Sequence, residues 1–219
     1  MPTVLISGAN RGIGLEFARQ SAADGWTVIG TARHPDGADE LRATGAEILP
    51  LDIADPASIA GLARAVGDRS IDLLFANAGI YGNARLDSAT WLDVLRVNTI
   101  GPTLLAAALR DRVAASDQKR MIAVTSGMGS IGETEGGHIP YRTSKAALNM
   151  AWKNLAIEYA RDGITVAVIN PGWVQTDMGG PGASVTPENS VAGMRCVIAA
   201  LTPADSGRFL SYDGKEFGW

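Results

Sequence analysis

Cysteine is almost absent from this 219-residue sequence, in which Cys196 is the single example. A lone cysteine excludes an intrachain disulfide and any zinc site built from several cysteines. Only two histidines occur, and no carboxylates cluster at ligand spacing, so we expect no metal site. Cys196 lies in an apolar helical pattern and is expected to be a small buried side chain rather than a nucleophile.

An excess of basic residues is also missing. The sequence has 19 Lys and Arg against 23 Asp and Glu, a net charge of -4, which argues against nucleic acid as a partner. No uninterrupted apolar run reaches the ~18 residues that a membrane-spanning helix needs. The segment Met1-Pro2-Thr3-Val4 lacks the basic region of a signal peptide. We therefore expect a cytoplasmic protein with no membrane partner.

Short β-branched runs alternate with longer amphipathic stretches along the whole chain. The runs are almost continuously apolar, which is typical of parallel strands covered on both faces. This alternation predicts an α/β fold in one domain, 1–219, with a doubly wound parallel sheet of about seven strands and helices on both faces. Strands are expected at 4–6, 26–31, 47–51, 71–76, 121–125, 164–169 and 208–210, and helices at 13–23, 58–66, 91–113, 141–160 and 187–200.

A glycine-rich turn joins the first expected strand to the first expected helix. Its glycines, Gly8, Gly12 and Gly14, have the spacing G-x-x-x-G-x-G. Glycine permits a tight turn and lets the backbone approach a pyrophosphate, which the N–H groups and dipole of the helix start then favour. The turn, with Asn10, Arg11 and Ile13, is therefore predicted to bind a dinucleotide.

The end of the second expected strand indicates which dinucleotide is bound. A carboxylate there would hold the ribose 2′-OH of NAD, but the strand ends Thr31-Ala32-Arg33, without an acid. Arg33 can pair with a phosphate through its planar guanidinium, and Arg11 lies within reach of the same group. These residues favour NADP(H); the alternative is that either arginine is only a solvated side chain at the rim.

Tyr141 and Lys145 are four residues apart on one expected helix, so their side chains share a face. An ammonium near a phenol favours the phenolate and is expected to lower the pKa of Tyr141 from ~10 toward neutral pH, which suits a general acid–base. Such a pair is weak evidence for catalysis by itself, because Tyr and Lys are common on helices. It gains weight because Asn77 and Ser126 follow expected strands, where parallel sheets bind ligands, and because Asn98 is a polar residue within an apolar helix.

Taken in order, these motifs resemble the short-chain dehydrogenase/reductase family over the entire chain, with its Rossmann-like fold. Within that family, the segments 141–150 and 207–219 resemble the sniffer and C-factor-like carbonyl reductases. The motifs are the turn 8–14, Asp52, Asn77-Ala78-Gly79, Asn98, Ser126, Tyr141 with Lys145, and Asn170-Pro171-Gly172 with Thr176.

The resemblance implies a reduction in which NADPH delivers a hydride to a carbonyl carbon while Tyr141 supplies a proton to the oxygen. Ser126 would position that oxygen, Lys145 would lower the pKa of Tyr141 and bind the nicotinamide ribose, and Asn98 would hold a water for reprotonation. The segment between Ser126 and Tyr141 is longer than is usual in the family, so Ser130 and Thr125 are alternatives to Ser126.

The resemblance also assigns the cofactor contacts. Asp52 and Ile53 would contact adenine, whereas Val174 (through its backbone) and Thr176 would hold the carboxamide. The implied cofactor-binding residues are Gly8, Asn10, Arg11, Gly12, Ile13, Gly14, Arg33, Asp52, Ile53, Asn77, Ala78, Gly79, Tyr141, Lys145, Pro171, Gly172, Val174 and Thr176.

An apolar wall suited to an aldehyde, ketone or quinone is expected from residues that flank this site. Simple packing is the alternative for each of them, since large apolar residues are mostly core. His138 in the same region is expected to be solvated. The candidate substrate contacts are Met128, Ile131, Trp173 and Met178, with Tyr81 beside them.

The predicted function is that of an NADPH-dependent carbonyl reductase. The alternatives are a C-factor-like nucleotide-binding signalling protein and an NAD-linked alcohol dehydrogenase. As in the family, we expect a homodimer or homotetramer, paired through the helices 91–113 and 141–160. Candidate contacts are Ala151, Trp152, Leu155 and Ala156, although a stripe that faces the core would look the same.

Overall fold

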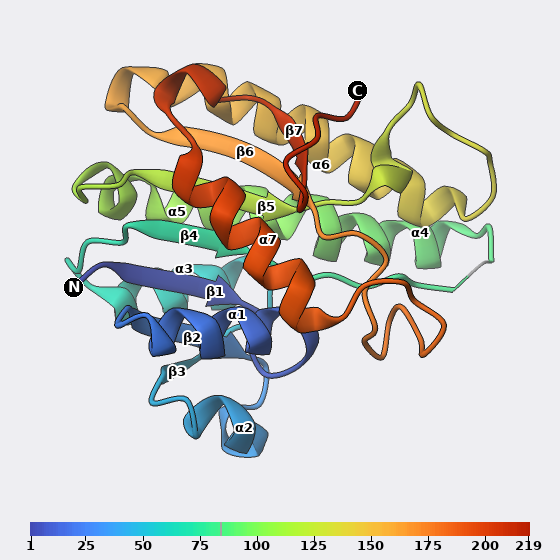
Figure 1. Ribbon diagram of the computed structural model, residues 1–219. Coiled ribbons are helices and arrows are strands. Elements are labelled where there is room, and N and C mark those ends of the chain that lie inside the picture. The colour runs from blue at the N-terminus through green and yellow to red at the C-terminus, as the bar shows by residue number, and fades with distance from the viewer. Residues whose placement is uncertain (84) are drawn as a thin grey trace.

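A parallel β-sheet forms the centre of the computed structural model, which describes residues 1–83 and 85–219 (Figure 1). Within these residues seven strands pair in the order β3-β2-β1-β4-β5-β6-β7, all of them parallel. Both the fold class and the number of strands expected from the sequence are confirmed. The strands are β1 (Thr3–Ser7), β2 (Thr27–Ala32), β3 (Glu47–Pro50), β4 (Leu73–Ala76), β5 (Arg120–Val124), β6 (Thr165–Asn170) and β7 (Phe209–Ser211).

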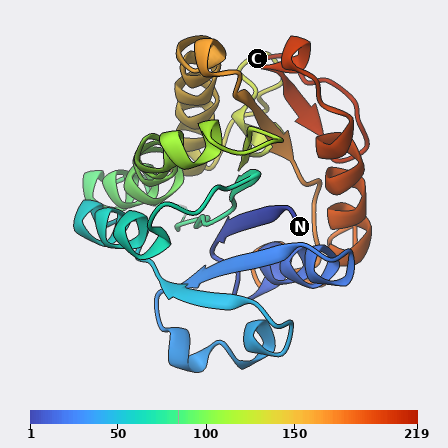
Figure 2. The same ribbon diagram turned by 90° about the vertical axis from the view of Figure 1, so that its left-hand side faces the viewer.

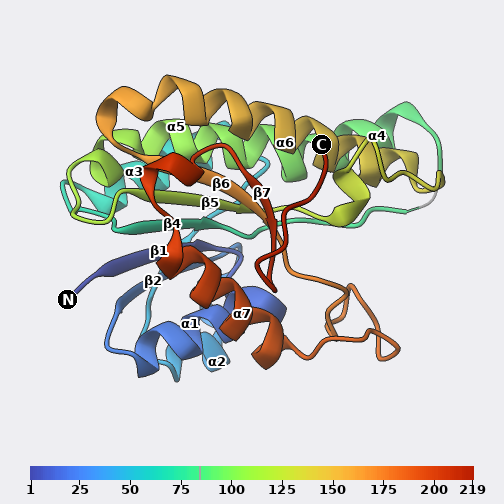
Figure 3. The ribbon, with the colours of Figure 1, turned by 45° about the horizontal axis from the view of Figure 1, so that its top comes forward.

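Helices cover both faces of this sheet. Helices α1, α2 and α7 lie on one face, and α3, α5 and α6 lie on the other, as Figures 2 and 3 show. A π-helical turn, Arg96–Ile100, joins α4 to α5, so the two continue as one helical segment. The helices are α1 (Gly12–Ala23), α2 (Asp39–Arg42), α3 (Pro56–Val66), α4 (Ser88–Leu95), α5 (Gly101–Ala114), α6 (Ile139–Glu158) and α7 (Pro187–Ala200).

Local sequence signals set where several helices begin. The Asp55 carboxylate accepts a hydrogen bond from Ala57 N at the start of α3, and Asp87 accepts one from Thr90 N at the start of α4. The Thr186 hydroxyl accepts one from Asn189 N at the start of α7. Each of these side chains satisfies a backbone donor that the first helical turn leaves unpaired.

The strand order reverses between β1 and β4, in the middle of the sheet, and such a reversal creates a crevice at the carboxyl ends of these strands. The chain runs outward from β1 to β2 and β3, and then returns to β4 on the other side of β1. The loops that follow β1 and β4 therefore diverge at the carboxyl ends of neighbouring strands, where doubly wound sheets bind their ligands.

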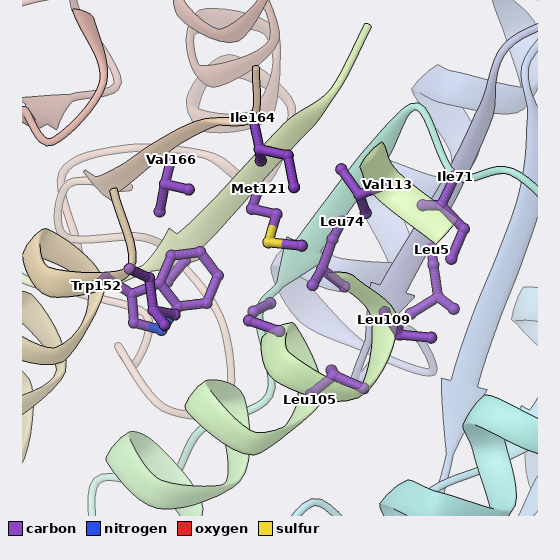
Figure 4. Close-up of a cluster of buried hydrophobic side chains, with 14 of the residues drawn as sticks. Leu5, Ile71, Leu74, Leu105, Leu109, Val113, Met121, Trp152, Ile164 and Val166 are labelled. Carbon is purple, nitrogen blue, oxygen red and sulfur yellow. The ribbon is translucent and has the colours of Figure 1, made fainter. Parts of the chain in front are cut away.

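Two apolar cores lie on the two faces of the sheet. Figure 4 shows the core beneath α5 and α6, where Trp152 lies near Met121 and Val166. Trp152, Leu155 and Ala156 are all buried in this core. Their assignment as contacts between subunits is therefore wrong, because they form the inward stripe of α6.

The expected burial of Cys196 is also wrong, because its side chain is exposed. Helix α7 turns Val191, Met194 and Ile198 toward the sheet, and Cys196 lies off that stripe.

By length and composition the helical segment Ser88–Ala114 could cross a membrane, but part of it is buried against the sheet, as in a core helix.

Large apolar side chains remain exposed on the outer faces of α5, α6 and the π-helical turn, namely Ile100, Leu104, Met150 and Ile157. If the chain self-associates as expected from the sequence, burial of these residues supplies the apolar area. We predict that light scattering gives the mass of a dimer or tetramer, and that the double substitution Met150→Glu, Ile157→Glu reduces it toward one chain. Ala192→Glu, on the exposed side of α7, is the control and should leave the mass unchanged. A mass that the double substitution does not reduce would contradict this interface.

Candidate active site

The glycine turn between β1 and α1 can be built only with little side-chain bulk. Gly8 and Gly12 have positive φ angles of 68° and 54°. A Cβ on Gly14 would lie 2.2 Å from the carbonyl oxygen of Gly8, which is backbone and cannot move aside. The turn therefore requires glycine at position 14, because any side chain there would collide with the backbone of Gly8.

The start of α1 is open to an anion. Arg11 occupies the N-cap without a side-chain capping bond, and the first turn holds no acidic residue. The N–H groups of that turn have no partner within the helix, and the helix dipole adds partial positive charge. A phosphate placed there would satisfy both, so this turn fits the pyrophosphate of a dinucleotide.

Asn77 fastens this turn to the end of β4. Its amide Nδ2 donates hydrogen bonds to the carbonyl oxygens of Ser7 and Gly8 at 3.1 and 2.9 Å. The hydroxyl of Ser7 accepts bonds from the backbone N–H groups of Asn77 and Ala78, each at 3.0 Å. Asn77 therefore shapes the dinucleotide-binding turn through its side chain.

The two arginines predicted to bind a 2′-phosphate lie in different surroundings. Arg33 is exposed at the end of β2 and, among residues 1–83 and 85–219, forms no ion pair. Arg11 pairs with Asp177, at 3.1 Å, in the loop after β6. Both partners are largely exposed, and such pairs are weak. Arg33 thus offers an uncommitted cation at the rim, whereas Arg11 links the two sides of the crevice.

The two residues expected to contact adenine, Asp52 and Ile53, lie in the loop after β3. Asp52 is exposed and its carboxylate accepts a hydrogen bond from Ala54 N, while Ile53 is buried. A Cβ on Gly101, at the start of α5, would lie 2.2 Å from the carbonyl oxygen of Ile53. Gly101 therefore lets α5 approach this loop, a requirement that sequence analysis missed although a Gly-Pro pair marks the position.

Tyr141 and Lys145 lie one turn apart on α6, as predicted. The Lys145 Nζ atom is 5.8 Å from the centroid of the Tyr141 ring and donates a hydrogen bond to the carbonyl oxygen of Val124 at 2.9 Å. Both side chains are buried, and Tyr141 is 8% exposed. A Cβ on Gly79 would lie 3.7 Å from Nζ, so the loop after β4 passes close to the ammonium.

The predicted lowering of the Tyr141 pKa is wrong for the free protein. Burial raises the pKa of Tyr141 to about 12, although a hydrogen bond with Ser126 acts in the opposite direction. Burial also lowers the pKa of Lys145 to about 8. Removal of both groups from water therefore outweighs their mutual attraction. The phenol keeps its proton at neutral pH, as a proton donor must.

Ser126 is the serine that faces Tyr141. It follows β5 and caps the 3₁₀ turn Gly127–Gly129, where its Oγ accepts a hydrogen bond from Met128 N at 3.1 Å. The alternatives are otherwise engaged: Thr125 donates to the Asn149 side chain at 2.6 Å, and Ser130 accepts from Glu133 N at 3.3 Å. The longer connection to Tyr141 therefore does not displace Ser126.

Asn98 joins the loop after β4 to α6 from the π-helical turn. Its Oδ1 accepts a hydrogen bond from Ile80 N, and its Nδ2 donates to Ile80 O, both at 2.8 Å. The same Nδ2 donates to the Ser144 hydroxyl at 3.0 Å. The side chain is fully buried and its bonding explains how a polar group is tolerated there. Its role in holding a water stays a prediction.

The predicted substrate residues divide into two groups. Met128 is half-buried beside Tyr81, whose hydroxyl lies 4.0 Å from the Met128 sulfur. In contrast, Ile131, Trp173 and Met178 are 73%, 59% and 51% exposed, so they form an outer rim rather than a wall. His138 is exposed, as expected.

The loop after β6 lies across the crevice from the glycine turn. A Cβ on Gly12 would be 3.3 Å from the Thr176 methyl group, which brings the turn and the loop together. Val174 is buried and pairs with Val185, while Pro171 is buried at the start of the loop. Thr176 and Val174 are therefore well placed to border a dinucleotide that lies on the turn.

The residues after β7 cover the turn that carries Ser126. Phe217 N donates a hydrogen bond to Phe209 O at 2.8 Å, and the Phe217 ring lies 3.1 Å from where a Cβ on Gly127 would stand. Gly132 N donates to Trp219 O at 3.1 Å. This segment, Phe217–Trp219, is a support of the site that the motifs did not reveal.

Comparison with known proteins shows the family to which the chain belongs. Residues 2–184 match the family described as short chain dehydrogenase. The C-signal protein of Myxococcus xanthus is 40% identical over 154 residues, which cover 68% of this chain and 93% of that protein.

Solved structures match over the full chain. The NADPH-bound carbonyl reductase from chicken fatty liver is 36% identical, with a TM-score of 0.93 and coverage of 100% of this chain and 99% of that chain. The carbonyl reductase Sniffer of D. melanogaster is 31% identical, with a TM-score of 0.91 and full coverage of both chains. The resemblance inferred from the motifs is confirmed.

The buried ammonium makes the stability of the free protein depend on pH. Between the folded pKa of about 8 and the ordinary value of 10.5, the unfolded chain holds a proton that Lys145 has lost in the fold. Stability from this group therefore increases as pH rises through that range. We predict that urea unfolding from pH 7 to 10 shows the wild type gaining stability relative to Lys145→Met; a difference that is independent of pH would contradict this.

Proposed function

Because the chain belongs to the short-chain dehydrogenase family, we propose that it is an NADP(H)-dependent reductase that converts an aldehyde, ketone or quinone carbonyl to the alcohol. The observation that carries this proposal is the convergence of Tyr141, Ser126 and Lys145 beside an uncapped glycine turn. A cytoplasmic location is part of the proposal, and it is supported by the near absence of cysteine.

Each residue has a defined task in this reduction. When bound, the nicotinamide supplies the hydride that adds to the carbonyl carbon. The Ser126 hydroxyl orients the carbonyl oxygen, and the Tyr141 phenol transfers its proton to that oxygen as negative charge develops there. One hydride and one proton thus convert C=O to CH–OH. The Lys145 ammonium stabilises the phenolate that remains, until a proton from solvent restores it.

The surroundings of the crevice support NADP(H) over NAD(H). No carboxylate ends β2, and Arg33 offers an unengaged guanidinium at that rim within the described part of the chain. A 2′-phosphate would find a bidentate partner there. Arg11 contributes by reaching the same phosphate once it leaves Asp177, which it contacts at 3.1 Å.

A nucleotide-binding signalling protein is the second candidate, favoured by the 40% identity to C-signal. Such a protein would need the glycine turn but not an oriented proton donor. The hydrogen bond between Tyr141 and Ser126 therefore favours an enzyme over a signalling protein. An NAD-linked alcohol dehydrogenase would use the same residues in reverse, and the cofactor measurement below separates it from the reductase.

Substitution of Tyr141→Phe tests the proton donor. We predict that it lowers kcat for carbonyl reduction by about 10²–10⁴-fold, because the general acid is removed. The affinity for NADPH, measured by fluorescence titration, stays unchanged. Tyr159→Phe, a buried tyrosine 18 residues further along the chain and past the end of α6, is the control and keeps full activity. A Tyr141→Phe protein that still reduces carbonyl compounds at the wild-type rate would contradict the assignment of Tyr141 as the proton donor.

Substitution of Arg33→Ala tests the choice of cofactor. We predict a loss of affinity for NADPH of about 10- to 100-fold, the size of one charge-assisted hydrogen-bonded pair, and little change for NADH. Titration with both cofactors measures the ratio. Arg42→Ala, whose guanidinium pairs with Asp39 nearby, is the matched control. An equal loss for the two cofactors would show that Arg33 does not bind the phosphate.

A further inference from the structure

An aromatic cluster lies against the catalytic phenol. The ring of Tyr81 is 4.6 Å from the ring of Tyr141 and 5.1 Å from the ring of His138, measured between centroids. The Tyr81 hydroxyl touches the sulfur of Met128 at 4.0 Å. We call Tyr81, Met128, His138 and Tyr141 the aromatic cluster; its members come from the loop after β4, the turn after β5 and the start of α6.

Tyr81 is held firmly in this position by its neighbours in the sequence. Both backbone polar groups of Ile80 are hydrogen-bonded to the Asn98 amide, at 2.8 Å each. Gly82 has a positive φ of 73°, and a Cβ there would come within 2.6 Å of the Val94 side chain on α4. Tyr81 is therefore presented between two anchored residues rather than on a free loop.

The segments that carry the cluster also expose apolar side chains. Tyr81 and Met128 are half-buried, and Ile131 and Ile139 are exposed on the segment between Ser126 and Tyr141. Charged residues of the same segment, Glu133 and Glu135, lie in its central part. The side chains grouped around Tyr81 are thus two flat rings, the Tyr141 phenol and the His138 imidazole, and the polarisable Met128 thioether, which together favour contact with another flat, apolar group.

We propose that Tyr81 is a specificity residue that selects carbonyl compounds whose carbonyl is attached to a planar conjugated ring: aryl aldehydes, aryl ketones and quinones. The ring of the substrate packs on the aromatic cluster while its carbonyl oxygen reaches the hydroxyl groups of Ser126 and Tyr141. Aromatic pairs of this kind gain energy beyond the apolar area that they bury. This inference rests on the proposed carbonyl reductase function and narrows its substrate class.

Benzaldehyde and cyclohexanecarbaldehyde form the test pair, since both carry a six-membered ring but only the first is planar and conjugated. With NADPH, we expect Tyr81→Ala to lower the preference for benzaldehyde, the ratio of the two kcat/KM values, by about 3- to 10-fold, mainly through KM. Tyr81→Phe should keep the wild-type ratio. Leu92→Ala, an exposed apolar residue on α4, is the control and leaves both rates unchanged.

Two results would overturn the inference: an unchanged ratio in Tyr81→Ala, or the same loss of ratio in Tyr81→Phe. A weaker affinity for NADPH in Tyr81→Ala would also overturn it, because the cluster would then support the cofactor instead of the substrate.

Equilibrium binding separates this inference from the proposed function. Titration of the NADPH-loaded protein with benzyl alcohol and cyclohexylmethanol measures the same preference without turnover, because neither alcohol can react with the reduced cofactor. A wild-type protein that prefers benzyl alcohol through Tyr81 but reduces neither aldehyde would support the inference and contradict the reductase alone. A protein that shows no preference for benzyl alcohol would overturn the inference whatever its activity.

Discussion

The site depends on the buried ammonium of Lys145, which forms no ion pair within residues 1–83 and 85–219. The ammonium of Lys145 is held by the carbonyl oxygen of Val124, and its burial lowers its pKa to about 8. Accommodating this side chain restricts the surrounding backbone. A Cβ on Gly129 would lie 2.9 Å from Lys145 backbone and side-chain atoms, and Gly79 approaches Nζ from the opposite loop. Gly129 is therefore required by the close approach of its turn to α6 at Lys145, whereas a Cβ on Gly79 would be in ordinary contact with Nζ. A buried charge without an ion-pair partner weakens the fold and is retained where it has a use.

Most of the fold could be predicted from the sequence because the periodicity of its apolar residues distinguishes strands from helices. All seven strands and the five longer helical segments were located to within three residues, since continuous apolar runs and amphipathic stretches alternate so regularly. What failed was the direction in which single residues face. Cys196 lies off the buried stripe of α7, whereas Trp152 lies on the stripe of α6, and both stripes are apolar in sequence. The π-helical turn at Arg96–Ile100 leaves no sequence pattern that a helical period would reveal.

The sequence predicted those site residues that follow strand ends or share a helix face. It did not predict properties that depend on contacts between distant segments. Ser126, Tyr141 and Lys145 were found because motif order and helix spacing bring them together. The pKa of Tyr141 was predicted in the wrong direction, because a pairwise attraction can be read from spacing while the loss of solvent cannot. Tyr81 illustrates the same limit: its contact with Tyr141 depends on how Asn98 holds the loop, which only the assembled structure reveals.

The packing of Phe217 against Gly127 has a consequence for how the protein acquires its active form. The two residues are 217 − 127 = 90 positions apart, and Gly132 and Trp219 repeat the long-range connection. Contacts between such distant positions form slowly, because a long segment must be closed before they are made. We therefore expect the turn around Ser126 to become ordered only after β7 has joined the sheet, because Phe217 reaches this turn through its contact with Phe209. Pulsed hydrogen exchange would detect this order as late protection of the Gly132 amide.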